Sequence, residues 1–591
     1  MPIAPSPRPV RIANVSGFFG DRLSALREIV QGGPVDVITG DYLAEVTMRI
    51  LGKLQAKNPG LGFAPTFIAQ LEPVMGEVLS RGIRVVVNAG GLNPRGLGMA
   101  LLMIGQRLGL APRIAVVEGD DLRSRLDELR EKNGHFMSLE SGEPLPATPG
   151  HVHTANAYLG AWGIVRALQE GADIVITGRV TDASLVVGTA AWWHGWSRDD
   201  WHKLAGAVAA GHVIECGPQA TGGNYSSFLS LGAPARPAFP IAEVAADGSS
   251  VITKHEGQPG AVTVGTVTAQ LVYEVTGARY LNPDVTTHLD TITLTQEAPD
   301  RVALRGTRGS PPPPTTKVAI TTKGPFRNEM TFAFVGLDID AKIELFERTT
   351  RAASLAKKAQ LTFQRVGSAV DDAPTQDGAT VLLRVIATSD DEAAVGRPFQ
   401  AALIEQGLSS YPGLFATGLP GDPVEASGYW PTLVAQADLV HQVILPDGRT
   451  ETIALPPVMA PVAATPASEA TAGGYEGETT RGPLGWLVDA RSGDKGSDAN
   501  VGLWVRDRAA YGWLASELTV ARLRELLPEA ASLAVERHEF PGLGAVNFVI
   551  HGLLAGGAIA TLRFDRQAKA LGEFLRSRHV ELPREFLPTE G

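Results

Sequence analysis

Five short apolar runs, each separated from the next by segments with helical periodicity, place the strongest constraint on the fold of this chain. They are VRIANV (10–15), VDVIT (35–39), IRVVVN (83–88), RIAVVEG (113–119) and ADIVIT (172–177). The intervening segments, such as DRLSALREIVQGG and YLAEVTMRILGKLQ, are amphipathic with glycine at several of their ends. Strands that are apolar on both faces and alternate with helices form parallel sheets. Residues 1–235 are therefore predicted to form an α/β unit, a mostly parallel sheet with helices on its faces.

The pattern changes after about residue 235. Alternating runs predict strands at AVTVGTVTAQLVYEV (261–275), DTITLTQ (290–296), TKVAITT (316–322), TFAFVGL (331–337) and TVLLRVIAT (380–388), with one strong helix pattern over 341–360. This indicates a mixed α+β region over 236–455. Residues 456–483 are rich in Ala, Pro, Thr and Gly without periodicity and are predicted to be a linker. Strand and helix patterns over 484–591 predict a small α+β domain.

Composition excludes several classes of protein. The formal net charge is -11 and no basic tract occurs, so a sequence-independent nucleic-acid footprint is not expected. No apolar run approaches the roughly 20 residues of a membrane span, and the start of the chain has no apolar core of a signal peptide. The single cysteine, Cys216, cannot form an internal disulfide and fits a reducing compartment. We expect a cytoplasmic protein with no membrane partner, and a homo-oligomer because symmetric assemblies are common.

Polar residues follow each of the five predicted strands. Asp21 comes after VRIANV, Asp41 after VDVIT, Asn93 after IRVVVN, which itself ends on Asn88, and Asp120 and Asp121 after RIAVVEG. ADIVIT is followed by Gly178, Arg179 and Asp182 within GRVTDASL. Each acid or amide alone is more often a helix cap than a site residue. Together they favour a ligand crevice, because the carboxyl ends of parallel strands meet at one edge of a sheet. No phosphate-binding glycine motif follows any of these strands.

Three further segments carry candidate site residues. PGHVHTANAYLGAWG (149–163) contains Asn156, and its His-x-His pair lacks the further ligands of a zinc site. In HVIECGPQATGGNYSSF (212–228), Glu215 and Cys216 end an apolar run that we interpret as another strand. Neighbouring negative charge disfavours a thiolate, so Glu215 is the better acid/base candidate. SGDKGSDANVG (492–502) is either a long hairpin loop or a functional loop in which Lys495 holds a carboxylate or phosphate, oriented by Asp494 or Asp498.

The chain resembles the acyclic terpene utilisation protein AtuA family. The resemblance rests on GDYLAEVTM, VVNAGGLNP, ANAYLGAWGIVRALQEGADIVITGRVTDASL, HVIECGPQATGGN and ARSGDKGSDANVGLWV, and it covers nearly the whole chain. It implies a large N-terminal domain (1–455) and a C-terminal ferredoxin-like domain (484–591). It also implies a part in the breakdown of citronellol- and geraniol-type terpenes, beside biotin-dependent acyl-CoA carboxylases. Motif membership points to thirteen residues: Asp41, Glu45, Asn88, Asn93, Asn156, Arg179, Asp182, Glu215, Asn224, Asp494, Lys495, Asp498 and Asn500.

Two functions from different classes are consistent with these residues. The first is an enzyme that abstracts a proton next to the carbonyl of a branched acyl-CoA or carboxylate, with hydration, dehydration or lyase chemistry. Its predicted catalytic residues are Asp182, Glu215, Arg179 and Asn156, and the other nine would bind substrate. A CoA thioester would be substrate rather than cofactor. The second is a non-catalytic partner of acyl-CoA carboxylase subunits. A variant of the first adds Mg²⁺ bound by Asp41, Asp120, Asp121 and Asp182, since hard cations prefer oxygen ligands.

Overall fold

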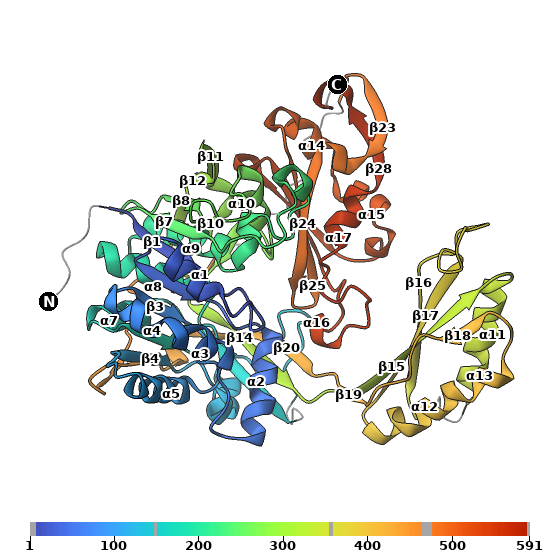
Figure 1. Cartoon of the computed structure of the whole chain (residues 1–591), viewed down its shortest axis with the longest axis horizontal. Coiled ribbons are helices and arrows are strands. Elements are labelled where there is room, and N and C mark those ends of the chain that lie inside the picture. The colour runs from blue at the N-terminus through green and yellow to red at the C-terminus, as the bar shows by residue number, and fades with distance from the viewer. Residues whose placement is uncertain (1–7, 147–150, 354–357, 463–474, 588–591) are drawn as a thin grey trace. The chain divides into compact units, whose positions relative to one another are not determined.

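The computed structural model describes residues 8–146, 151–353, 358–462 and 475–587 (Figure 1). Its centre is an eleven-stranded sheet with the order β11-β12-β8-β7-β1-β2-β3-β6-β4-β21-β22. The five apolar runs form β1 (Val10–Asn14), β2 (Val37–Gly40), β3 (Arg84–Val87), β4 (Ile114–Glu118) and β6 (Ile174–Thr177). These five are adjacent and mutually parallel. The predicted parallel α/β core is confirmed.

Helices cover both faces of this parallel core. One face packs alternate strand residues, among them Val85, Val87 and Ile176, against α1 (Ala25–Gly32), α3 (Pro65–Leu71), α4 (Met75–Ser80) and α5 (Pro94–Arg107). The sheet also contacts α7 (Trp162–Gln169), α8 (Ser184–His194) and α9 (Trp201–Ile214), which lie outside that core cluster and therefore cover the other face. Both faces of the strands are buried, which explains their continuous apolar character.

The edges of the sheet come from much later in the chain. On the β1 side it continues through β7 (Ile241–Val244), β8 (Ser250–Thr253), β12 (Arg301–Arg305) and β11 (Thr293–Ala298), all antiparallel. On the β4 side it continues through β21 (Gln442–Ile444) and β22 (Thr450–Thr452). Residues on either side of 235 thus share one sheet. Two small sheets accompany it. The first has the order β13-β10-β9, from β9 (Arg279–Leu281), β10 (Thr286–His288) and β13 (Arg308–Ser310). The second has the order β20-β14-β5, from β5 (Val152–Ala157), β14 (Thr315–Thr322) and β20 (Gly428–Ala435).

One predicted strand is wrong. AVTVGTVTAQLVYEV forms α10 (Val264–Leu271), opened by a capping box in which Thr263 and Thr266 exchange hydrogen bonds. Thr263 is the first residue of a T-x-x-T pattern, and the two threonine side chains satisfy backbone N–H groups that a helix leaves unpaired at its start. The helix is buried on most sides, as Val267, Ala269 and Leu271 are almost inaccessible to solvent. Its sequence therefore has apolar, β-branched residues all around the helix, and their alternation does not indicate a strand. Capping and burial outweigh strand propensity here.

Residues 322–429 form a separate compact unit. Its antiparallel sheet has the order β16-β17-β15-β18, with β16 (Gln360–Val366) and β18 (Leu414–Ala416) at its edges. The two central strands, β15 (Phe326–Val335) and β17 (Thr380–Ser389), pair along ten residues. The helix pattern predicted over 341–360 appears as α11 (Ile339–Ala352). Phe346 of α11 packs against Phe332 and Phe334 of β15, with ring centroids 4.6 and 5.7 Å away. Residues 354–357 of the predicted helix lie outside the described residues, and its last residue, Gln360, begins strand β16 instead.

The C-terminal domain is a four-stranded antiparallel sheet with helices packed on it, drawn in orange and red in Figure 1. The order is β24-β25-β27-β26, from β24 (Val488–Lys495), β25 (Asp498–Val505), β26 (Val535–Phe540) and β27 (Ala545–Ile550). The covering helices are α14 (Tyr511–Glu517), α15 (Val520–Leu526) and α17 (Leu571–Arg576). The predicted linker ends earlier than expected, because Thr479–Pro483 form β23 and pair with β28 (His579–Pro583).

Candidate functional site

The carboxyl edge of the parallel strands brings predicted site residues together. Asp41 follows β2 and Asn88 follows β3, and the Nδ2 of Asn88 donates to Oδ1 of Asp41 at 2.5 Å. The same aspartate accepts from Leu43 N at 3.1 Å, and Oδ1 of Asn88 accepts from Tyr42 N at 2.7 Å. Burial, reinforced by the nearby charge of Asp182, raises the pKa of Asp41 well above its usual range. Asp41 therefore holds its proton to a higher pH than an ordinary aspartate does.

A second pair of strands contributes Asp120 and Arg179. Oδ2 of Asp120 accepts from the backbone N of Arg179 at 2.8 Å and from Nδ2 of Asn156, on β5, at 2.7 Å. Gly178 is needed here, because a Cβ at that position would collide with the Asp120 carboxylate. Burial raises the pKa of Asp120 to about 7 against the effect of these two hydrogen bonds. Oδ1 of Asn156 is buried and has no hydrogen-bond partner in the described part of the chain.

Arg179 is a buried cation with an ion pair and an aromatic neighbour. Its Nη1 lies 2.5 Å from Oδ1 of Asp182 and 3.1 Å from the carbonyl of Leu43. Its guanidinium lies over the ring of Tyr158, 4.2 Å from the centroid. The alternative in which Asp182 caps α8 is wrong, since Ala183 holds the N-cap position and no side chain caps that helix. The carboxylate of Asp182 accepts a hydrogen bond from Arg179 instead and compensates its charge.

Glu45 begins α2 (Glu45–Lys57) and lies beside Tyr158 as well. Its Oε1 accepts from the Tyr158 hydroxyl at 3.0 Å and from Nζ of Lys317 at 3.3 Å. Although burial raises the pKa of Glu45, Lys317 and then Arg179 outweigh it and hold this pKa well below its usual range. Glu45 is thus a permanent anion, in contrast to Asp41 four residues earlier.

Glu215 reaches the same edge from a helix, which corrects our interpretation of HVIE as the end of a strand. It follows the last residue of α9, and Asn14, at the end of β1, donates from its side chain to the carbonyls of Ile214 and Glu215 at 2.7 and 2.8 Å. Oε1 of Glu215 lies 3.0 Å from Nδ1 of His212, one turn earlier, while Oε2 has no hydrogen-bond partner among the described residues. Burial, aided by Asp182 and opposed by His212, raises the pKa of Glu215.

The C-terminal domain supplies two further charges through the β24–β25 hairpin. The expected eleven-residue loop is wrong, because the strands pair as far as Lys495 and Asp498 and leave a two-residue turn, with Gly496 at φ 65°. Lys569 lies 3.3 Å from Asp494 and 3.2 Å from Glu274. Burial, and then the neighbouring charge of Glu274, raises the pKa of Asp494 to about 6.

Lys495 is the central cation of this cluster. Within the described ranges its side chain makes no hydrogen bond or ion pair. Its charge nevertheless lowers the pKa of four nearby groups, Glu45, His212, Glu215 and Glu274. Asn500, also on the hairpin, accepts from the backbone N of Glu274 at 2.7 Å and so fixes the hairpin to the N-terminal domain. One cluster of charges therefore joins the sheet edge, the end of α9 and the C-terminal hairpin.

Three of the thirteen predicted residues have other surroundings. Asn93 caps α5, since its side chain accepts from Gly96 N at 2.9 Å. Asn224 is exposed, in a left-handed turn with φ 53°. Asp498 accepts from Nδ1 of His551 and from Gly552 N, both at 2.9 Å, within the C-terminal domain. The cap alternative is the better description of Asn93.

Cys216 and the proposed magnesium ligands also have defined surroundings. Burial, with the charge of Glu215 next, raises the pKa of the Cys216 thiol well above its usual range, which agrees with preferring Glu215. Asp121 is paired with Arg123 at 2.6 Å, while Asp120 and Asp182 have the partners given above. Across the described ranges, no group of three or more His, Cys, Asp or Glu side chains is arranged to hold a metal ion.

The sequence motifs missed several members of the cluster. His212 lies three residues before Glu215, the spacing of neighbours on one helix face, but the interpretation of this run as a strand concealed it. Lys317 is the charged residue of the alternating strand TKVAITT, and Glu274 follows the helix that was expected to be a strand. Lys569 belongs to no motif that we quoted.

Comparison with known protein families gives the identity of the chain. The model of the acyclic terpene utilisation family protein AtuA matches residues 10–445, and the AtuA ferredoxin-like domain matches residues 483–581. The chain belongs to the AtuA family. The first match covers every sheet-edge residue described above, and the second covers the hairpin that carries Asp494 and Lys495. No curated protein and no solved structure matches the chain. In the described part of this AtuA family member, no helix is both long and apolar enough to cross a bilayer.

Proposed function

We propose that this chain is an enzyme of acyclic terpene or branched-acid breakdown that removes a proton next to the carbonyl of a branched carboxylic acid or its CoA thioester. Hydration, dehydration or carbon–carbon cleavage would follow. The observation that supports this most is Glu215, a buried carboxyl group with one oxygen held by His212 and the other without a hydrogen-bond partner. A general base needs such an oxygen within reach of the proton that it removes.

The charges around Glu215 fit this chemistry. In the proposed step the C–H electron pair moves toward the carbonyl, the proton passes to Oε2 of Glu215, and an enolate oxygen forms. The raised pKa of Glu215 brings the base closer to the operating pH. Lys495, which has no ion-pair partner in the described residues, would neutralise the enolate oxygen. Oδ1 of Asn156 would accept a hydrogen bond from a substrate hydroxyl or from water.

The space at this edge is small in the structure. Glu45, Asn156, Tyr158 and Arg179 line a cavity of about 10 Å³, together with Met48, Thr154, Ala319 and Thr321. About 10–15 Å³ is needed to hold one water molecule by this measure. A branched acid therefore requires side chains to move, and Lys495 is a candidate, since its side chain has no direct partner among the described residues.

Exchange of the α-proton with solvent tests the proposal directly. Purified protein would be incubated in D₂O with a panel of branched acids and their CoA thioesters, and deuterium uptake followed by mass spectrometry. We expect uptake with at least one substrate, and a reduction of roughly 10²–10⁴-fold in Glu215→Gln. Cys216→Ser is the matched control, because it changes the adjacent residue and keeps the base.

Two results would contradict the proposal. Undiminished exchange in folded Glu215→Gln would remove Glu215 as the base. Absence of exchange across the panel, together with stable co-purification of acyl-CoA carboxylase subunits, would favour the non-catalytic partner instead. Circular dichroism and urea unfolding of each variant establish that the fold is intact.

A further inference from the structure

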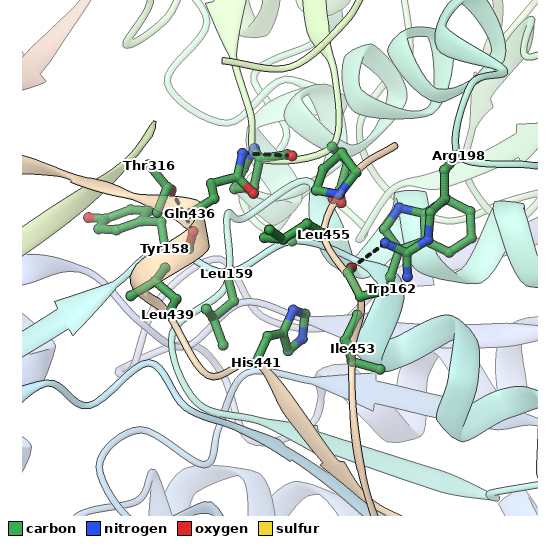
Figure 2. A pocket seen from close by; sticks show the side chains of 15 residues that line it. Tyr158, Leu159, Trp162, Arg198, Thr316, Gln436, Leu439, His441, Ile453 and Leu455 are labelled. Atoms are coloured by element: carbon green, nitrogen blue, oxygen red, sulfur yellow. Dashed lines mark hydrogen bonds between the residues drawn. The ribbon is translucent and has the colours of Figure 1, made fainter. Parts of the chain in front are cut away.

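A second cavity, which shares only Tyr158 with the lining of the first, is shown in Figure 2. Its volume is about 40 Å³, which by the same measure holds about three water molecules. The wall is largely aliphatic, with Leu159, Leu439, Ile453 and Leu455. Polar side chains converge on it from segments far apart in the sequence: Arg198, Asp284 and His441. None of these belongs to the site proposed above.

Arg198 brings a positive charge without an ion pair. Within the described part of the chain no carboxylate lies within ion-pairing distance of it, and its Nη1 donates to the carbonyl of Ala454. Its guanidinium stacks on Trp162, 4.7 Å from the ring centroid, as Figure 2 shows. Burial lowers the pKa of Arg198, which is the cost of burying the cation, and the charge of Asp284 on the same cavity wall opposes this only in part. An anion bound in the cavity would remove this cost.

Asp284 and His441 bring a hydrogen-bond acceptor and a neutral imidazole. Asp284 is buried and accepts from Ala161 N at 2.7 Å. His441 points into the cavity in Figure 2, and its Nε2 is buried without a hydrogen-bond partner in the described residues. Burial lowers the pKa of His441 to about 4, so the ring stays neutral and offers one N–H.

Two glycines keep these groups uncovered. A Cβ at Gly160 would collide with the carboxylate of Asp284, and a Cβ at Gly163 would lie 2.7 Å from Nε2 of His441. Both glycines are at the start of α7. Because neither glycine has a side chain, the carboxylate of Asp284 and Nε2 of His441 are not covered and can contact a ligand in the cavity.

We propose that this cavity, which we call the Arg198 pocket, binds a small hydroxy-carboxylate of about two carbons. The carboxylate would accept hydrogen bonds from the guanidinium of Arg198 and from His441. The ligand hydroxyl would donate a hydrogen bond to the carboxylate of Asp284. This donor allows the negatively charged Asp284 to lie beside a ligand that is itself an anion. The aliphatic wall would cover the short carbon chain.

Binding of glycolate and acetate to the full-length protein tests this proposal. The two anions have similar size and differ in the hydroxyl, so saturation-transfer NMR should show saturable binding of both, with glycolate bound several-fold more tightly. Arg198→Gln should weaken glycolate binding roughly tenfold or more, since a charge-assisted hydrogen bond is lost. Asp284→Asn should reduce the preference for glycolate over acetate. Arg449→Gln, an exposed arginine with its own ion pairs, is the control.

The outcomes separate this proposal from the proposed enzyme activity. Absence of saturable glycolate binding at millimolar concentration overturns it, as does unchanged affinity in folded Arg198→Gln. If that variant fails to fold, a crystal structure of the wild-type protein with glycolate decides, and an empty cavity between Arg198 and Asp284 overturns the proposal. Deuterium exchange catalysed through Glu215 is measured without these anions and is independent of either result.

Discussion

Nη1 of Arg179 lies 2.5 Å from Oδ1 of Asp182, and this pair neutralises the most deeply buried cation of the site. The arginine side chain is 5% exposed and the aspartate side chain 24%. The pair also shows that Asp182, in the motif GRVTDASL, forms an ion pair with Arg179 and does not cap the helix that follows. Asp182 thus affects the site both by compensating the charge of Arg179 and by raising the pKa of Asp41 and Glu215.

Asp182→Asn should reduce activity strongly and also destabilise the protein. The amide keeps a hydrogen-bond acceptor but leaves Arg179 without a compensating charge, at a cost of about 2 kcal/mol in the free energy of unfolding. Urea unfolding and the exchange assay measure the two effects. Asp199→Asn, an exposed aspartate outside the site, is the control. Wild-type activity and stability in folded Asp182→Asn would contradict this role.

Asp120 should make stability depend on pH. Its pKa in the folded protein is about 7 against 3.8 for an ordinary aspartate. Between pH 4 and 7 the folded protein therefore holds a proton that the unfolded chain has released, and the free energy of unfolding falls as pH rises through this window. The contribution is at most roughly 4 kcal/mol. Asp120→Asn retains an acceptor for Arg179 N, so its urea-unfolding profile should be flatter over this window; an equal slope would contradict the assignment.

Lys495→Gln should change the pH profile more than the stability. The lysine has no direct partner in the described residues, so we expect a change within about 0.5 kcal/mol. Its charge lowers the pKa of Glu215, and removing it should move the acidic limb of the kcat/KM profile to higher pH. Lys569→Gln is the comparison, because it breaks ion pairs with Glu274 and Asp494 and should destabilise more. An unmoved acidic limb would place Lys495 outside the site.

Asn93 should behave as a helix cap. Asn93→Ala removes the acceptor for Gly96 N and should cost about 1 kcal/mol of unfolding free energy, whereas Asn93→Ser retains a capping oxygen without placing a carboxylate against the carbonyls of Gly60 and Leu61 and should cost less. Both variants should keep activity near that of the wild type. Loss of activity in both, at wild-type stability, would support the substrate-binding role expected from the motif.

The parallel core and the gathering of polar residues at its carboxyl edge could be predicted because both follow from one periodicity. Apolar strands alternating with helices require a parallel sheet, and the ends of those strands then place Asp41, Asn88 and Arg179 together whatever the details of packing. The ion pair between Arg179 and Asp182 was harder to predict. An acid near the start of a helix can either cap that helix or pair with a nearby cation, and only the side-chain rotamer decides between these roles.

The rest depended on contacts that local sequence does not encode. Glu215 follows α9, a helix that is apolar on all sides and therefore lacks the alternation of apolar and polar residues by which a helix is recognised in a sequence. His212 lies in the same helix and was missed for the same reason. The hairpin of Asp494 and Lys495 looked like a loop because Gly, Ser, Asp and Asn are turn residues. It forms strands since β25 also pairs with β27, a neighbour some fifty residues further on. Lys569 reaches the cluster only through the folding of the C-terminal domain.

The order of strands in the large sheet has a consequence for synthesis of the chain. β4 ends at Glu118, but the strand that covers its open side, β21, begins at Gln442. While a ribosome adds the more than three hundred residues between them, the nascent chain displays an uncovered row of backbone N–H and C=O groups along β4. A truncated product that stops before residue 442 should therefore aggregate through this edge.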